Sequence, residues 1–301
     1  MASNWLFNGR STADQVLSGK DLSDKTIIVT GANTGIGFET ARSLAAAGGH
    51  VIMAGRNRAT NEAAIKKIMA LHSDANVEFA PLDLASLESV REFCDTLAAE
   101  AVDILICNAG VTTPDYRETA DGFEQTVGIC HRGHFLLTQL LLPKLLATPD
   151  ARVIVVSSES HRYPKVIDFN KLPFPKADYK GLSAYGQAKL CNTLFANELQ
   201  RRYADKGLMA CSLHPGTFVT TDIGRNSLLG RVAMTLASPF TKSPAQGAAT
   251  SVFCATHEPA EDIGGLYLSD CQPKRNSKEA DNETAAKKLW ELSEQWVGVN
   301  P

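Results

Sequence analysis

The sequence lacks the features that mark several common protein classes. Its seven cysteines are scattered and odd in number, and none forms a Cys-x-x-Cys pair. Neither a disulfide framework nor a cysteine-based zinc site is therefore indicated, and a reducing compartment is expected. The most apolar stretch, residues 135–146, contains Pro143 and Lys144 and is too short and too polar to span a bilayer. The first ten residues have no long apolar core, so they predict neither a signal peptide nor an anchor.

A strong charge imbalance is missing as well. The 301 residues carry 30 Lys and Arg against 33 Asp and Glu, which gives a net charge of −3. Nucleic-acid-binding proteins usually concentrate a basic excess on one face, so no nucleic-acid partner is expected. The hydrophobic fraction of 44% is too high for a disordered chain. Together these values predict a cytoplasmic globular protein with a substantial core.

The sequence does contain a regular alternation of short apolar runs and longer segments of helical period. Apolar runs without strict polar alternation are typical of strands buried on both faces of a parallel sheet. Repeated strand–helix–strand order implies right-handed crossovers. We therefore predict an α/β fold, a single Rossmann-type doubly wound parallel sheet of about seven strands with helices on both faces. The strands are expected at 26–29, 50–54, 77–80, 104–107, 153–156, 210–213 and 266–268, and the helices at 36–47, 60–71, 86–99, 122–142 and 183–203.

The whole chain, residues 1–301, is expected to form one dinucleotide-binding catalytic domain, because no linker or repeat divides it. Residues 1–24 are interpreted as a lead-in. Two irregular stretches, 159–182 and 218–244, are long enough to be functional covers. Residues 280–297 predict an amphipathic C-terminal helix that docks on its own domain, with a partner-binding helix as the alternative.

A glycine-rich turn directly follows the first expected strand. Its sequence, Thr-Gly-Ala-Asn-Thr-Gly-Ile-Gly over residues 30–37, permits a tight turn and lets backbone N–H groups approach a pyrophosphate at the start of a helix. The strand–turn–helix context makes this a strong dinucleotide signal, with a ligand-free tight turn as the alternative. The predicted cofactor residues of this turn are Gly31, Asn33, Thr34, Gly35, Ile36 and Gly37.

The end of the second strand indicates which cofactor binds. An acidic residue there usually holds a free ribose 2′-hydroxyl, but this sequence has Gly55 and Arg56 instead. Glycine leaves space and a planar guanidinium suits a 2′-phosphate, so NADP(H) is favoured over NAD(H). The alternative is that Arg56 and Arg58 are ordinary solvated residues at a helix start.

Polar and small residues also follow the third and fourth strands. Asp83 and Leu84 are placed to flank an adenine, and Asn108, Ala109 and Gly110 to let the backbone approach the ribose. Taken alone, Asp83 is equally suited to be the N-cap of the next helix.

A Ser, a Tyr and a Lys form the candidate catalytic set. Ser157 and Ser158 end the fifth strand, and Tyr185 and Lys189 are four residues apart on one helix face. Tyrosine titrates near pH ~10, and a neighbouring ammonium would favour its phenolate. A serine hydroxyl can hydrogen-bond a substrate oxygen while Tyr185 gives or takes its proton. On its own, such a Tyr–Lys pair is more often a core tyrosine and a surface lysine.

In this order the motifs resemble the short-chain dehydrogenase/reductase superfamily from about Ser23 to Asp270. The likeness extends to the retinol-dehydrogenase-like branch and to the oxidoreductase domain of the WW domain-containing oxidoreductases, through GANTGIGFETA and ARVIVVSSESHR. Trp5, Trp290 and Trp296 do not have the spacing of a WW domain.

The resemblance implies a role for each motif residue. Ser158 positions the carbonyl, Tyr185 is the acid/base, and Lys189 holds the ribose and perturbs Tyr185. The nicotinamide loop would comprise Pro215, Gly216 and Thr220, residues 218–244 would form the substrate lid, and relatives often form homodimers through the helices at 122–142 and 183–203.

Cys130 departs from the family pattern. It stands where the family usually has an Asn whose backbone carbonyl helps to hold a water leading to the lysine. A carbonyl survives this replacement, so we expect a working but altered proton relay. A metal site built from His131, His134 and His161 is not favoured, since no acidic or Cys partner has supporting spacing.

These motifs are compatible with two functions. The first is an NADP(H)-dependent oxidoreductase that interconverts an alcohol and a ketone or aldehyde on a lipophilic small molecule. The alternative is a nucleotide-binding sensor or scaffold protein with weak or altered catalysis.

Overall fold

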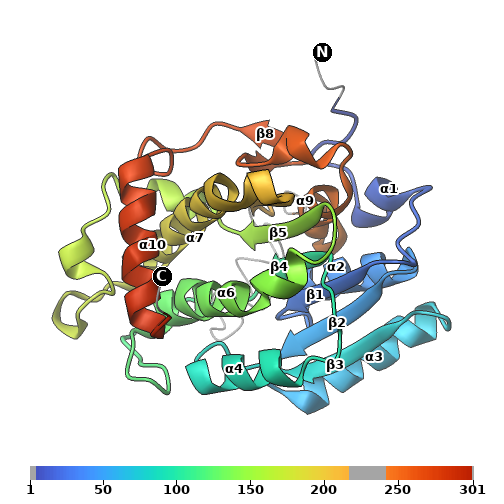
Figure 1. Cartoon of the computed structure of the whole chain (residues 1–301), viewed down its shortest axis with the longest axis horizontal. Coiled ribbons are helices and arrows are strands. Elements are labelled where there is room, and N and C mark those ends of the chain that lie inside the picture. The colour runs from blue at the N-terminus through green and yellow to red at the C-terminus, as the bar shows by residue number, and fades with distance from the viewer. Residues whose placement is uncertain (1–4, 217–241, 300–301) are drawn as a thin grey trace.

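The computed structural model describes residues 5–216 and 242–299. Its centre is an eight-stranded sheet with the order β3-β2-β1-β4-β5-β6-β7-β8, shown in Figure 1. The strands are β1 (Thr26–Thr30), β2 (His50–Gly55), β3 (Val77–Pro81), β4 (Ile104–Cys107), β5 (Ala151–Val156), β6 (Leu208–His214), β7 (Tyr267–Ser269) and β8 (Gln272–Lys274). The first seven strands are parallel, which confirms the predicted fold class.

The eighth strand is not among the predicted ones. β8 pairs with β7 in the antiparallel direction and consists of three residues with Pro273 in the middle. Proline within a strand is tolerated at a sheet edge, where its missing N–H needs no partner. A polar segment this short carries no periodic signal, so its position beside β7 decides its structure.

Helices cover both faces of the sheet. The described helices are α1 (Ala13–Leu17), α2 (Gly35–Ala46), α3 (Arg58–Leu71), α4 (Leu87–Thr96), α5 (Gln125–Val127), α6 (Gly133–Leu145), α7 (Gly181–Tyr203), α9 (Pro244–Thr256) and α10 (Glu283–Val297). Shorter turns are the π-helix η1 (Gly128–Arg132) and the 3₁₀ turns η2 (Glu159–Arg162), η3 (Phe169–Lys171), η4 (Lys176–Asp178), η5 (Ala204–Lys206) and η7 (Ala260–Ile263). None of the helices within 5–216 and 242–299 is long and apolar enough to cross a membrane.

The strand residues alternate between two hydrophobic cores. Ile27 and Val29 of β1 pack into the core formed with α1, α2 and α9, whereas Ile28 packs into the core formed with α4, α6, α7 and α10. Burial of both strand faces is the physical reason for the continuous apolar runs in the sequence.

The C-terminal helix α10 packs against the domain itself. Trp290 is buried, and its ring lies 5.1 Å from that of Phe135 in α6 and 6.0 Å from that of Phe195 in α7. Figure 1 shows α10 running across α6 and α7. These are the helices through which a homodimer is expected, so α10 occupies part of that surface.

Candidate active site

A cavity of about 690 Å³ opens at the carboxyl ends of the parallel strands. The chain runs outward from β1 to β3 and then, in the other direction, from β4 to β7. The boundary between β1 and β4 is the topological switch point, where open α/β sheets bind their ligands. The predicted site residues that line this cavity are Gly31, Asn33, Thr34, Gly35, Ile36, Gly37, Arg56, Asp83, Leu84, Asn108, Ala109, Gly110, Tyr185, Lys189 and Pro215.

Other predicted residues lie elsewhere. Ser158, Cys130 and Gly216 do not line the cavity, and Thr220, with most of the expected lid 218–244, lies outside the described residues. Gly55 and Ser157, which the sequence places at strand ends, also line the cavity. So do residues that sequence reasoning missed, namely Ala54, Asn57, Thr60, Asn61, Leu82, Val111, Thr112, Ile129 and Val156. Most of them follow the carboxyl ends of strands that the sequence already predicts. Because ligands of parallel sheets bind at these ends, including a few more residues after each strand would have identified them.

The glycine turn has a shape that side chains would destroy. A Cβ on Gly37 would lie 2.4 Å from the Gly31 carbonyl oxygen and 2.5 Å from Asn108 Nδ2. Gly31 itself has a φ of +65°, which glycine adopts at little cost. Asn108 Nδ2 donates to the Thr30 carbonyl at 2.8 Å, which ties the end of β4 to the turn. The turn is therefore a cradle of backbone atoms that fits a pyrophosphate at the start of α2.

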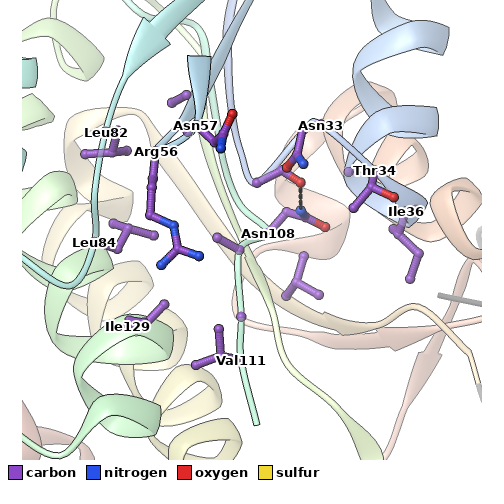
Figure 2. A pocket seen from close by; sticks show the side chains of 18 of the residues that line it. Asn33, Thr34, Ile36, Arg56, Asn57, Leu82, Leu84, Asn108, Val111 and Ile129 are labelled. Carbon is purple, nitrogen blue, oxygen red and sulfur yellow. Dashed lines mark hydrogen bonds between the residues drawn. The ribbon is translucent and has the colours of Figure 1, made fainter. Parts of the chain in front are cut away.

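The two arginines after β2 have different surroundings. Arg58 pairs with Glu62 at 3.2 Å and lies over the Phe79 ring at 4.9 Å. Among the described residues Arg56 makes no hydrogen bond or ion pair, and Figure 2 shows its side chain extending past Leu82 and Leu84 into the cavity. Arg56 is thus the cation available to an anionic ligand.

Asp83 is not the N-cap of the following helix. Ser86 caps α4, with its side chain accepting from the Ser89 N–H. Asp83 instead accepts from the Ala85 N–H at 3.0 Å, which closes a short turn at the cavity wall. Of the two interpretations of Asp83, the helix cap is therefore wrong.

Lys189 is a buried cation beside Tyr185. Its ammonium donates to the Val156 carbonyl at 2.9 Å and lies 5.6 Å from the centre of the Tyr185 ring, and only 3% of the residue is exposed. A Cβ on Gly110 would lie 3.3 Å from this ammonium. The cavity is therefore continuous from the glycine turn to a Tyr–Lys pair on the first turns of α7.

The two serines at the end of β5 have different bonding. The buried Ser157 hydroxyl donates to the Lys189 carbonyl at 2.7 Å and accepts from Thr193 Oγ1 at 2.9 Å. The half-buried Ser158 hydroxyl accepts from the Ser160 N–H at 3.2 Å. The Ser157 hydroxyl thus joins β5 to α7, whereas the Ser158 hydroxyl bonds only within its own turn.

The predicted helix 122–142 is interrupted. It divides into α5, the π-helix η1 and α6, and the buried Cys130 lies in the middle of η1. The Val111 N–H donates to Cys130 Sγ at 3.4 Å, and Sγ lies 3.5 Å from the Val111 carbonyl. Burial raises the pKa of the Cys130 thiol, although the nearby Lys189 cation opposes this. The neutral thiol can therefore both accept from and donate to Val111, which joins the π-helix η1 to the segment after β4.

A buried histidine joins the π-helix η1 to the ends of β1 and β4. His134 Nδ1 lies 3.0 Å from the Cys130 carbonyl and therefore donates to it, so its Nε2 accepts from Thr30 Oγ1 at 2.9 Å. Thr30 Oγ1 in turn accepts from the Asn108 and Ala109 N–H groups at 3.0 and 2.9 Å. Burial lowers the pKa of His134 to about 4, which keeps this tautomer neutral.

His131, another histidine of the metal site that is not favoured, has different partners. His131 Nε2 bonds to Ser293 Oγ at 2.8 Å, and its ring packs against those of Phe195 and Trp296. In the part of the chain that the structure describes, no group of three or more His, Cys, Asp or Glu side chains has the arrangement of a metal site.

Known proteins resemble the chain along nearly its whole length. A family model for short chain dehydrogenase matches residues 25–169. WW domain-containing oxidoreductase of Danio rerio is 49% identical over 299 residues, covering 97% of this chain and 73% of that protein. Retinol dehydrogenase 11 of Homo sapiens is 42% identical over 280 residues, covering 92% and 87%. A solved structure of an uncharacterized protein from Mycobacterium paratuberculosis, 35% identical, superposes with a TM-score of 0.76 over 96% of this chain and 97% of that one. The chain therefore belongs to the short-chain dehydrogenase/reductase family of oxidoreductases and is related to the retinol dehydrogenases.

Proposed function

We propose that the protein is an NADP(H)-dependent oxidoreductase that interconverts an alcohol and a ketone or aldehyde on a lipophilic small molecule. The observation that carries this proposal is the continuity of one cavity, which is lined by the glycine turn and Arg56 at one end and by Tyr185 and Lys189 at the other. A nucleotide bound at the glycine turn would place its nicotinamide ring near Tyr185 and Lys189.

The preference for NADP(H) rests on Arg56. Its guanidinium has no partner among the described residues, and the neighbouring Gly55 offers no carboxylate to repel a phosphate. A Cβ at Gly55 would lie 2.8 Å from Asn61 Nδ2, so a larger residue here would have to displace the Asn61 side chain. An unpaired guanidinium beside an open cavity suits the 2′-phosphate of NADP(H).

The catalytic roles follow from burial and charge. When bound, the nicotinamide supplies or accepts the hydride. The Tyr185 hydroxyl gives its proton to the substrate oxygen in reduction and takes it back in oxidation. The buried Lys189 ammonium lies 5.6 Å from the centre of the Tyr185 ring, on the same helix face. The Ser158 hydroxyl donates to the same substrate oxygen and fixes its position.

The lipophilic substrate class rests on relatedness. Retinol dehydrogenase 11, which is named for a lipophilic alcohol, shares 42% identity with this chain. The apolar residues at 228–236, which the resemblance assigns to a lid, lie outside the described residues.

The test is NADPH consumption against a panel of ketones, aldehydes and quinones. We expect turnover of at least one lipophilic carbonyl, and loss of that turnover in Tyr185→Phe. If no panel member shows Tyr185-dependent turnover while the nucleotide still binds, the sensor or scaffold function replaces the enzymatic one.

The cofactor assignment is tested with a matched pair of arginine variants. Charge-assisted hydrogen bonds contribute about 1.5–3 kcal/mol, so Arg56→Ala should weaken NADPH binding by roughly 10- to 100-fold and leave NADH binding unchanged. Arg58→Ala is the control, because Arg58 is already paired with Glu62. Equal losses for both nucleotides, or tighter binding of NAD(H) by the wild type, would contradict the assignment.

A further inference from the structure

His161 holds the backbone of Ser158 by two hydrogen bonds to one oxygen. Its ring Nδ1 lies 2.7 Å from the Ser158 carbonyl, and its backbone N–H donates to the same oxygen at 3.0 Å. Because a carbonyl oxygen only accepts, Nδ1 carries the proton. The His161 ring is fully buried and the other nitrogen, Nε2, has no partner within the described residues. Burial lowers the pKa of His161, which favours this neutral form.

These two bonds close the turn that carries the candidate substrate contact. Ser158 is extended, with φ −161° and ψ 157°, and it caps η2 by accepting from the Ser160 N–H. Both the hydroxyl and the carbonyl of Ser158 therefore accept hydrogen bonds within this turn, from the Ser160 and His161 N–H groups respectively. Rotation of Ser158 about ψ would break both bonds from His161, so the direction of its Cα–Cβ bond is fixed.

The turn is held in place from the sheet. The Tyr267 ring of β7 lies 4.6 Å from the His161 ring and is itself buried. The Tyr267 hydroxyl donates to Glu159 Oε1 at 3.1 Å, and Arg162 Nε donates to Glu159 Oε2 at 2.7 Å. Tyr267 thus contacts the turn at two points, through its ring on His161 and through its hydroxyl on Glu159. The imidazole cannot swing away from Ser158 without displacing a strand residue.

We propose that His161 is a positioning residue that aims the Ser158 hydroxyl at the substrate oxygen. The inference rests on the proposed function, in which Ser158 contacts the substrate, and adds a residue that acts only through Ser158. A misplacement of about 1 Å in a catalytic group can cost on the order of 100-fold in rate. Loss of the Nδ1 donor is therefore expected to lower kcat rather than to weaken nucleotide binding.

The test compares two substitutions at His161 in two backgrounds. His161→Asn keeps an N–H donor near the position of Nδ1, whereas His161→Phe keeps the ring and removes the donor. We expect kcat to fall by roughly 10- to 100-fold in His161→Phe, with the KM for NADPH within a factor of two, and to recover most of the way in His161→Asn. In the Ser158→Ala background, His161→Phe should have no further effect.

Two kinetic outcomes would overturn the inference. One is an equal fall in kcat on changing His161 to Phe with and without the Ser158 hydroxyl, which would show a general structural role. The other is a His161→Phe enzyme with unchanged kcat. If His161→Phe does not fold, Tyr267→Phe removes the bond to Glu159 and tests the same support, with a smaller fall in kcat expected and no effect in Ser158→Ala.

Crystal structures of the same variants keep this test separate from the test of the proposed function. If no substrate turns over even though Tyr185 is intact, the proposed function fails, and the position of Ser158 still decides the inference. Ser158 should be displaced in His161→Phe and retained in His161→Asn. An unmoved Ser158 in His161→Phe would refute the positioning role.

Discussion

Two buried histidines, His131 and His134, should make the protein sensitive to acid unfolding. Burial lowers the pKa of His131 to about 3 and that of His134 to about 4, from 6.5 in the unfolded chain. Both residues are neutral in the fold, so the unfolded chain binds more protons below pH 6.5. The stabilisation is complete above that pH and is lost as pH falls toward the folded-state values. Between pH 7.5 and 4.5 each of these histidines therefore lowers the free energy of unfolding by about 2–3 kcal/mol, a large part of a typical stability of about 5–15 kcal/mol.

His131→Phe removes one of the two titrating groups and so measures the contribution of His131 to the pH dependence of stability. The new ring enters the same aromatic surroundings, and Ser293 keeps its bond to the Leu289 carbonyl at 2.7 Å. Urea unfolding across this pH range should show a loss of unfolding free energy about 2–3 kcal/mol smaller in the variant than in the wild type. The packing cost of the substitution is read separately, at pH 7.5. An equal acid-induced loss in the two proteins would refute the conclusion that His131 is buried without a proton.

Three further predictions concern the cavity and its support. Gly37→Ala places a Cβ within 2.5 Å of two fixed groups, Gly31 O and Asn108 Nδ2, so it should abolish the rise in melting temperature that NADPH causes; a retained rise would contradict the backbone cradle. Cys130→Asn replaces a weak hydrogen-bonding group by a strong one and should change kcat and its pH profile by a few-fold, whereas identical profiles would remove residue 130 from the proton relay. Trp290→Ala should cost about 3–5 kcal/mol in urea unfolding, and a cost below about 1 kcal/mol would mean that α10 is not part of the core.

The cavity lining around the glycine turn could be predicted because local sequence determines it. A glycine turn, a strand end and the first turn of a helix are each continuous segments, and the parallel sheet brings their ends to one edge. Gly37 and Asn108 are 71 positions apart in sequence, yet each follows a strand whose apolar run is visible. The choice between Arg56 and Arg58 is different, because it depends on Glu62 and Phe79 satisfying one arginine and leaving the other free.

The expected homodimer stays a prediction, and the position of α10 restricts the surface that such a dimer could use. A two-fold contact through α6 and α7 would have to use the parts of these helices that α10 leaves open, or displace a helix anchored by Trp290. Sequence pattern could place an amphipathic helix at the C-terminus but could not say which face of the domain it covers. That face is set by the aromatic rings of Phe135 and Phe195, which lie 60 positions apart.

The polar network beneath the candidate catalytic residues shows most clearly what could not be predicted from the sequence. From spacing, a metal site containing His134 and His161 is not favoured, and the sequence assigns these histidines no other specific partner. In the fold each histidine uses its Nδ1 to bond a backbone carbonyl, of Cys130 and of Ser158, and these two residues are both predicted to be functional. A backbone carbonyl leaves no trace in the amino-acid sequence. The role of each histidine can therefore be assigned only when the fold shows which carbonyl oxygen its Nδ1–H contacts. A neutral imidazole suits this position because it donates one hydrogen bond without placing a charge in the core.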